Sequence, residues 1–249
     1  GITHVHHFYT KRNLCILSTG YRLISNIHNK HVRNTLFLIF SNVVTGLVSI
    51  LTRYNFKKSG NSQLPGTLYI PSFQAERNIL DALTGKILDL KRITDFKRND
   101  KYILNTTQSS TNISQVTDST IDYIFTDPPF GGNLMYSELN FIQESWLKVL
   151  TNNETEAIIN KTQSKGLDEY QKLMTAAFSE NYRILKPGRW MTVVFHNSQN
   201  KVWIAIQEAL EKVGFVVSDI RTMSKGKPTQ VQSKSSGAVK QDLVKSAYK

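Results

Sequence analysis

The chain has 249 residues, of which 40% are hydrophobic, so it can bury a substantial core and is neither fibrous nor disordered. Its 31 Lys and Arg residues against 19 Asp and Glu residues give a formal charge of +12, which is typical either of a protein with a polyanionic partner or of a solvated basic surface. The single cysteine, Cys15, excludes an internal disulfide. This cysteine content predicts a reducing compartment, the cytoplasm. No Cys/His set has the spacing of a zinc site, so we predict no metal.

Two helices are predicted at the N-terminal end. Between residues 10 and 25, Leu14, Leu17, Tyr21 and Ile24 recur at helical spacing. The uncharged segment 35–51 is shorter than the ~20 apolar residues that a bilayer needs and is interrupted by polar residues, so we predict a buried core helix and no membrane partner.

A domain boundary is predicted after Gly66. Residues 57–66 have the Gly and Pro content of an exposed loop. This divides the chain into a helical segment with a linker, 1–66, and a second domain, 67–249.

Strands and helices are expected to alternate in the second domain. Residues 121–126 form an apolar run that stops at a proline pair, as a buried strand ending in a loop would. The segments that follow are a helix from Asp168 closed at 186–188, a strand 190–196, a helix 201–213, and strands 215–220 and 242–248. This order predicts an α/β fold with a largely parallel sheet. The polar segment 224–238 has no helical pattern, so the last two strands should form an antiparallel edge hairpin.

The residues with the clearest chemistry are Asp127, Pro128, Pro129 and Phe130, directly after the strand 121–126. Ligands of open α/β sheets bind beyond the carboxyl ends of the strands. An exocyclic amine of adenine or cytosine is a poor nucleophile, because its lone pair is delocalised into the ring. A carboxylate and a carbonyl fixed in direction by two prolines can accept its hydrogen bonds and favour the pyramidal nitrogen that attacks a methyl sulfonium.

Phe130 suits the same chemistry, because a base taken out of the DNA stack needs an aromatic face to lie against. The alternative is that Asp-Pro-Pro only ends a strand with a turn and that Phe130 fills the core. The glycines at 131 and 132, which permit close approach of another molecule, and the basic chain favour the base-binding interpretation.

Residues 119–133 resemble motif IV of the DNA N6-adenine and N4-cytosine methyltransferases. Segments 136–140 with 146–147, 185–197 with 202–203, 241–244 and 10–14 are similar to parts of a group of large bacterial DNA methylases. The resemblance implies part of a Rossmann-like, S-adenosylmethionine-dependent methyltransferase sheet. It also implies methyl transfer to an exocyclic amine in DNA at a specific site, adenine N6 ahead of cytosine N4, with Asp127 to Phe130 as catalytic residues and DNA as partner. A restriction or defence-system protein is a further candidate partner.

The sequence departs from that group in two places. Members of that group hold the methionine portion of S-adenosylmethionine at a Phe-x-Gly-x-Gly turn, which this sequence lacks. The first residue of this sequence is Gly1. We therefore expect a C-terminal catalytic portion whose cofactor-binding residues are unknown. Phe130 replaces the commoner Tyr. Two alternatives stay open: an RNA guanine N2-methyltransferase and a catalytically silent DNA-binding fragment.

Several N-terminal residues compete between a functional and a structural role. His4, His6 and His7 are candidate metal ligands, although a fourth ligand at suitable spacing is lacking. Tyr9 and Arg12 are candidate contacts for the cofactor or the DNA backbone, against an ordinary helix start.

The same choice arises for residues toward the C-terminal end. His196 and Asn197 end the strand on the expected active edge, where we favour a hydrogen-bonding role over chemistry. Lys225, Lys227 and Lys234 are candidate phosphate contacts, with a solvated loop as the alternative.

Overall fold

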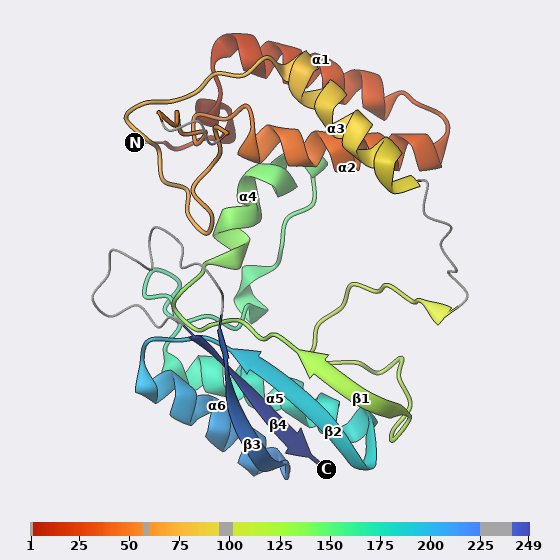
Figure 1. Ribbon diagram of the computed structural model, residues 1–249, viewed down its shortest axis with the longest axis vertical. Helices are drawn as coiled ribbons and strands as arrows, with labels where there is room; N and C mark the ends of the chain where they lie inside the picture. Colours follow the sequence, from red (N-terminus) through yellow and green to blue (C-terminus); the bar gives the residue numbers. More distant parts are fainter. Residues whose placement is uncertain (1, 57–59, 95–101, 225–240) are drawn as a thin grey trace. The chain divides into compact units, whose positions relative to one another are not determined.

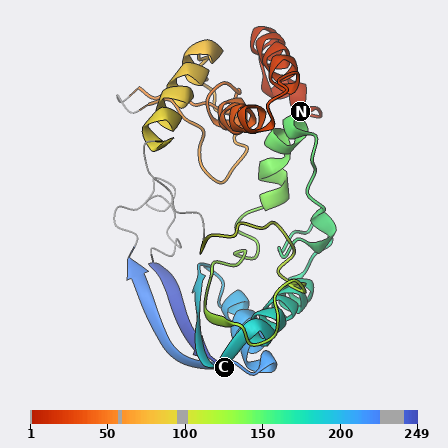
Figure 2. The same ribbon diagram turned by 90° about the vertical axis from the view of Figure 1, so that its right-hand side faces the viewer.

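The chain forms two compact units (Figure 1 and Figure 2). The computed structural model describes residues 2–56, 60–94, 102–224 and 241–249. The first unit combines residues 1–103 with 136–153, and the second combines 104–135 with 154–249. The predicted boundary after Gly66 does not coincide with this division, because two later helices pack with the N-terminal ones. As a functional boundary it stays a prediction.

The first unit is helical. Its elements are η1 (Val5–Phe8), α1 (Lys11–Ser25), α2 (Lys30–Gly46), α3 (Ile79–Thr94) and α4 (Tyr136–Leu147). Helix α1 begins where the Thr10 hydroxyl accepts a hydrogen bond from the amide of Asn13, and α2 begins where the Asn29 side chain accepts from the amides of His31 and Val32. Both predicted N-terminal helices are confirmed, and the second starts five residues earlier than predicted because Asn29 caps it.

The core of the first unit lies around α2, which contacts α1, α3 and α4. Phe40 and Val44 are almost completely buried there, and the Trp146 ring of α4 packs edge-on against Phe40 at 5.4 Å between centroids. The Trp146 indole donates to the Tyr9 hydroxyl at 2.8 Å, and that hydroxyl donates to the Val44 carbonyl at 3.0 Å. The uncharged segment is therefore part of a core helix as far as Gly46, where α2 ends, and the predicted continuation over 47–51 is wrong. None of the described helices is long and apolar enough to cross a membrane.

The second unit is a four-stranded sheet with two helices on one face (Figure 1). In chain order its elements are β1 (Ile121–Thr126), η3 (Asn153–Thr155), α5 (Leu167–Ile184), β2 (Leu185–Phe195), α6 (Asn200–Val213), β3 (Val216–Ser224) and β4 (Gln241–Tyr248). The strand order is β1-β2-β4-β3. Helix α6 ends at Gly214, whose φ of 107° is the left-handed conformation that glycine adopts without strain. The predicted α/β class is confirmed.

The sheet is mixed, which corrects the prediction of a largely parallel sheet. Strands β1 and β2 are parallel, with Thr126 opposite Val193. Strand β4 lies between β2 and β3 and is antiparallel to both. Its antiparallel pairing with β3 is the predicted hairpin. Strand β2 also begins at Leu185, five residues earlier than predicted.

Strand β1 is an edge strand among the described strands, whereas we predicted a buried one. From Tyr123 on the side chains alternate: Ile124 packs against the core formed with α5 and α6, whereas Tyr123 and Phe125 are 54% and 65% exposed. Ile121 packs against the same core as Ile124, and the register with β2 is irregular between Ile121 and Tyr123. The core on the helix-covered face includes Tyr170 and Phe178 of α5, with residues of α6, β2 and β4.

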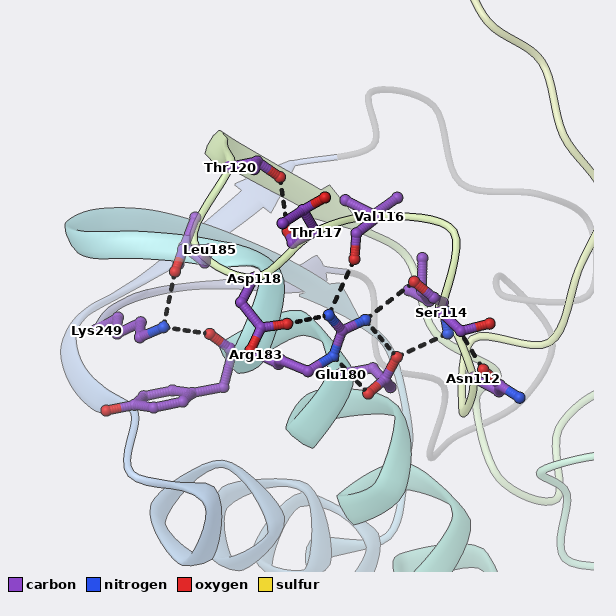
Figure 3. Close-up of polar contacts among 12 residues, drawn as sticks. Asn112, Ser114, Val116, Thr117, Asp118, Thr120, Glu180, Arg183, Leu185 and Lys249 are labelled. Atoms are coloured by element: carbon purple, nitrogen blue, oxygen red, sulfur yellow. Dashed lines mark hydrogen bonds and ion pairs between the residues drawn. The ribbon is translucent and has the colours of Figure 1, made fainter.

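A charged clamp holds the segment that leads into β1 (Figure 3). The guanidinium of Arg183 donates to the carbonyls of Ile113 and Val116 at 2.9 Å each and pairs with Glu180 and Asp118. The Glu180 carboxylate also accepts from the amide of Ile113 at 2.7 Å. The hydrogen bonds from Arg183 lower the pKa of Glu180 to about 2. The start of β1 is thus fixed to α5.

Candidate active site at the Asp-Pro-Pro-Phe loop

The loop that follows β1 lies at the carboxyl edge of the parallel pair. Asp127 comes directly after Thr126, and Asn197 comes two residues after Phe195, the end of β2. Because β1 and β2 run in the same direction, both loops leave the sheet at the same edge. The structure therefore brings Asp127 to Phe130 together with His196 and Asn197, as expected from the sequence.

The loop residues differ in exposure. Asp127 is exposed, Pro128 is buried, and Pro129 and Phe130 are half-buried. The Phe130 ring meets the Phe195 ring edge-on at 5.5 Å and the His196 ring at 6.1 Å between centroids. Phe130 thus contributes to the core with part of its surface and is partly accessible to solvent, so the geometry accommodates both interpretations of this residue.

Two buried side chains hold the backbone of the loop. The hydroxyl of Tyr170, on α5, donates to the Pro129 carbonyl at 2.6 Å, and the Asn197 amide group donates to the Phe130 carbonyl at 2.8 Å. Tyr170 is 0% exposed and Asn197 is 2% exposed. The loop is therefore attached both to α5 and to the end of β2.

Gly131 packs where no side chain fits. Its φ is +65°, and a Cβ there would lie 3.2 Å from Val202 Cγ1 and 3.3 Å from Asn197 Nδ2. Its carbonyl accepts from the amide of Ile159 at 3.3 Å. Gly131 thus serves close packing within the protein, whereas close approach of another molecule at the exposed Gly132 stays a prediction.

The arrangement provides a carboxylate and a backbone carbonyl in the same loop as an aromatic ring. The Asp127 carboxylate and the Pro128 carbonyl come directly before the two anchored carbonyls, and both prolines restrict φ. Acceptors that need no reordering suit a donor such as an exocyclic amine.

The N-terminal candidates have other surroundings. The rings of His4, His6 and His7 pack against one another, with His6 and His7 centroids 4.4 Å apart, and the described residues contain no His, Cys, Asp and Glu group arranged to hold a metal ion. Desolvation and the neighbouring rings of His6 and His4 lower the pKa of His7. Tyr9 is a buried core residue, and burial raises the pKa of its hydroxyl. Arg12 pairs with Glu76 at 3.0 Å.

Of the candidate residues toward the C-terminal end, the structure describes His196 and Asn197 but not the three lysines. Asn197 has the hydrogen-bonding role that we favoured, since its side chain holds Phe130 and accepts from the amide of Gln199 at 2.7 Å. The His196 carbonyl accepts from the Asn133 side chain at 3.3 Å. Lys225, Lys227 and Lys234 lie outside the described residues.

Sequence reasoning missed Tyr170 as part of this site. In the sequence it is one of several apolar positions of a helical pattern, 41 residues from Pro129, and nothing local marks its hydroxyl as a ligand of the loop. Asn197 lies at the end of a predicted strand, but no local signal marks its partner, which is 67 residues away.

The fold and the site place the second unit in the class of α/β proteins with an Asp-Pro-Pro-Phe loop at the carboxyl edge of a parallel strand pair. Residues 121–244 match a family model described as DNA methylase, of the N6/N4 type. This region of the chain is a DNA methylase domain of that family.

Solved structures give weaker similarities, and no curated protein matches the sequence. Two structures of a candidate DNA modification methylase from Thermus thermophilus share 13% identity with 57% of this chain. The complex with S-adenosyl-L-methionine has a TM-score of 0.35, and the selenomethionine derivative has 0.33. The chain covers 53% and 52% of the length of those two structures, respectively.

Proposed function

We propose that the protein transfers a methyl group from S-adenosylmethionine to an exocyclic amino group at specific DNA sites, with adenine N6 preferred over cytosine N4. The observation that carries the proposal is the anchored Asp127-to-Phe130 loop at the carboxyl edge of β1, inside the residues that match the DNA methylase model.

Asp127 is the proposed partner of the target amine. Its exposed carboxylate accepts hydrogen bonds from the amino group together with the Pro128 carbonyl, and this favours the pyramidal nitrogen that a methyl transfer requires. The half-buried ring of Phe130 then supports the extruded base.

The residues present fit the amine and not the methionine portion of the cofactor. The glycine turn after β1 is filled by Val202, Asn197 and Ile159, and the sequence has no Phe-x-Gly-x-Gly segment. We therefore assign no residue of this chain to hold the methionine portion. We predict that the 249-residue chain binds S-adenosylmethionine poorly and binds DNA weakly without sequence preference.

The test is methyl transfer by the full-length protein, followed by identification of the methylated base. Asp127→Ala should abolish transfer and leave cofactor binding largely intact, because the carboxylate acts on the amine. Asp122→Ala is the matched control: it removes a carboxylate from the strand that precedes the loop, where the Asp122 side chain pairs with Lys186 at 2.9 Å, and should keep activity.

The alternatives predict different products. N2-methylguanine in structured RNA, with no product in DNA, would support the RNA methyltransferase. DNA binding without transfer to either substrate would support the catalytically silent fragment. Single-turnover rates near wild type for Asp127→Ala would remove the proposed role of Asp127.

A further inference from the structure

The loop carbonyls at 129 and 130 are held from two elements that are far apart in the sequence. Tyr170 belongs to α5 and Asn197 follows β2, yet each donates one hydrogen bond to consecutive carbonyls of the same loop. Both donors are almost completely buried. A hydrogen bond between buried partners fixes direction strongly, because water cannot replace either partner.

Asn197 has little freedom to release the loop. Its side-chain oxygen accepts from the Gln199 amide at 2.7 Å, its side-chain nitrogen donates to Phe130, and its carbonyl accepts from the Trp203 indole at 2.8 Å. The Trp203 ring packs edge-on against Phe195 at 4.8 Å. Rotation of the Asn197 side chain breaks two of these bonds together.

We propose that Tyr170 and Asn197 are positioning residues for methyl transfer, which set the direction of the Asp127 and Pro128 acceptors by fixing the next two peptide groups. The inference rests on the proposed function. Neither side chain needs to touch the substrate. The prolines limit φ, and the two anchored carbonyls limit the remaining rotation of the loop, so the acceptors are held in one orientation before the base arrives.

The test compares single-atom and isosteric changes in the full-length protein. Tyr170→Phe removes one hydroxyl. Asn197→Asp keeps the acceptor for Gln199 but places a carboxylate oxygen against the Phe130 carbonyl. We expect kcat to fall about 10- to 100-fold in each, with KM for DNA unchanged, because misplacement of reacting groups by ~1 Å costs rate on this order. Because both residues act on one loop, the double variant should lose less than the product of the two losses.

Tyr9→Phe is the matched control. Tyr9 is also a buried tyrosine whose hydroxyl donates to a backbone carbonyl, that of Val44, but it lies in the first unit. It should lower the melting temperature at least as much as Tyr170→Phe, because it also removes the acceptor of the Trp146 indole, and it should leave kcat unchanged. A kcat loss in Tyr170→Phe no larger than in Tyr9→Phe would overturn the proposal.

Hydrogen exchange separates this inference from the proposed function. The amide of Asn133 donates to Phe130 and the amide of Ile159 donates to Gly131, so both report on the loop. Their exchange should accelerate in Tyr170→Phe and Asn197→Asp and not in Tyr9→Phe. If wild type transfers no methyl group but exchange accelerates, the proposed function fails while the anchoring of the loop holds. Unchanged exchange would overturn the anchoring itself.

Discussion

The two units divide charge and chemistry unequally. Residues 1–103 and 136–153 contain 16 Lys and Arg against 7 Asp and Glu, a formal charge of +9. Residues 104–135 and 154–249 contain 15 against 12, a formal charge of +3. The Asp-Pro-Pro-Phe loop belongs to the second of these. The unit that holds the Asp-Pro-Pro-Phe loop therefore carries the smaller share of the net positive charge, and substitutions in the loop and in the basic residues of the first unit should have different effects.

They also differ in what stabilises them. The first unit is built on a helical core around α2, with the Trp146–Tyr9–Val44 chain of hydrogen bonds inside it. The second unit adds ionic contacts at its periphery: Asp122, Glu169 and Glu180 all have a lowered pKa, from bonds to Lys186, the backbone around Gly166, and Arg183. Acid should act chiefly on the second unit.

After the loss of transfer expected for Asp127→Ala, the next large effect concerns Phe130. Phe130→Ala should lower methyl transfer by about 10- to 100-fold, since stacking on an aromatic ring contributes ~1 to 3 kcal/mol per base. Phe130→Tyr and Phe130→Trp should keep most activity, because the face of the ring holds the base. The measurement is the single-turnover rate on duplex DNA. Full activity of Phe130→Ala would make the ring a core residue that packs on Phe195.

A smaller effect should separate the units by charge. Changing Lys11, Arg22 and Lys30 to Glu should weaken DNA binding and reduce the slope of log K against log salt by about 1 for each phosphate that is no longer neutralised. The matched change in the second unit replaces three exposed lysines, Lys161, Lys172 and Lys201. We expect it to change affinity less. Equal losses would contradict the division of charge, and salt-independent binding would show that the basic excess is no nucleic-acid surface.

The smallest expected effect is acid sensitivity of the second unit. The pKa of Glu180 is about 2 in the folded protein, below its ordinary value of 4.5, so its stabilisation is complete above about pH 4.5 and is lost as the pH falls toward 2. Glu180→Gln should flatten this dependence. Fluorescence of Trp190 and Trp203 reports on the second unit and that of Trp146 on the first. The same acid response in both units would contradict the comparison.

Local signals in the sequence predicted much of the fold. Helices α1 and α6 follow from apolar spacing with a capping Thr10 and a terminal Gly214, and β1 follows from its apolar run before the prolines. We predicted no helix over the residues of α3, although the spacing of Ile79, Leu83 and Leu90 is typical of one. These features depend on neighbours within one or two turns of the chain.

Features that depend on contacts between distant parts of the chain were not predicted. An apolar strand reads the same at an edge as in the centre of a sheet, so the exposure of Tyr123 and Phe125 was not predictable. The position of the loop was predicted, because an apolar strand followed by two prolines is a signal within a few neighbouring residues. Its attachment to Tyr170 and Asn197 was not, because a hydroxyl or an amide in the sequence does not show which carbonyl it will meet.

The strand order has a consequence for synthesis on the ribosome. Strand β3 is joined to the rest of the sheet through β4, so among the described strands it has no partner until β4 is made, which begins at Gln241, opposite Ser224. Until β4 pairs with it, β3 presents unpaired backbone groups, with Val216 and Ile220 among its apolar side chains. Expression at lowered temperature or with a holding chaperone should therefore raise the soluble yield of the protein.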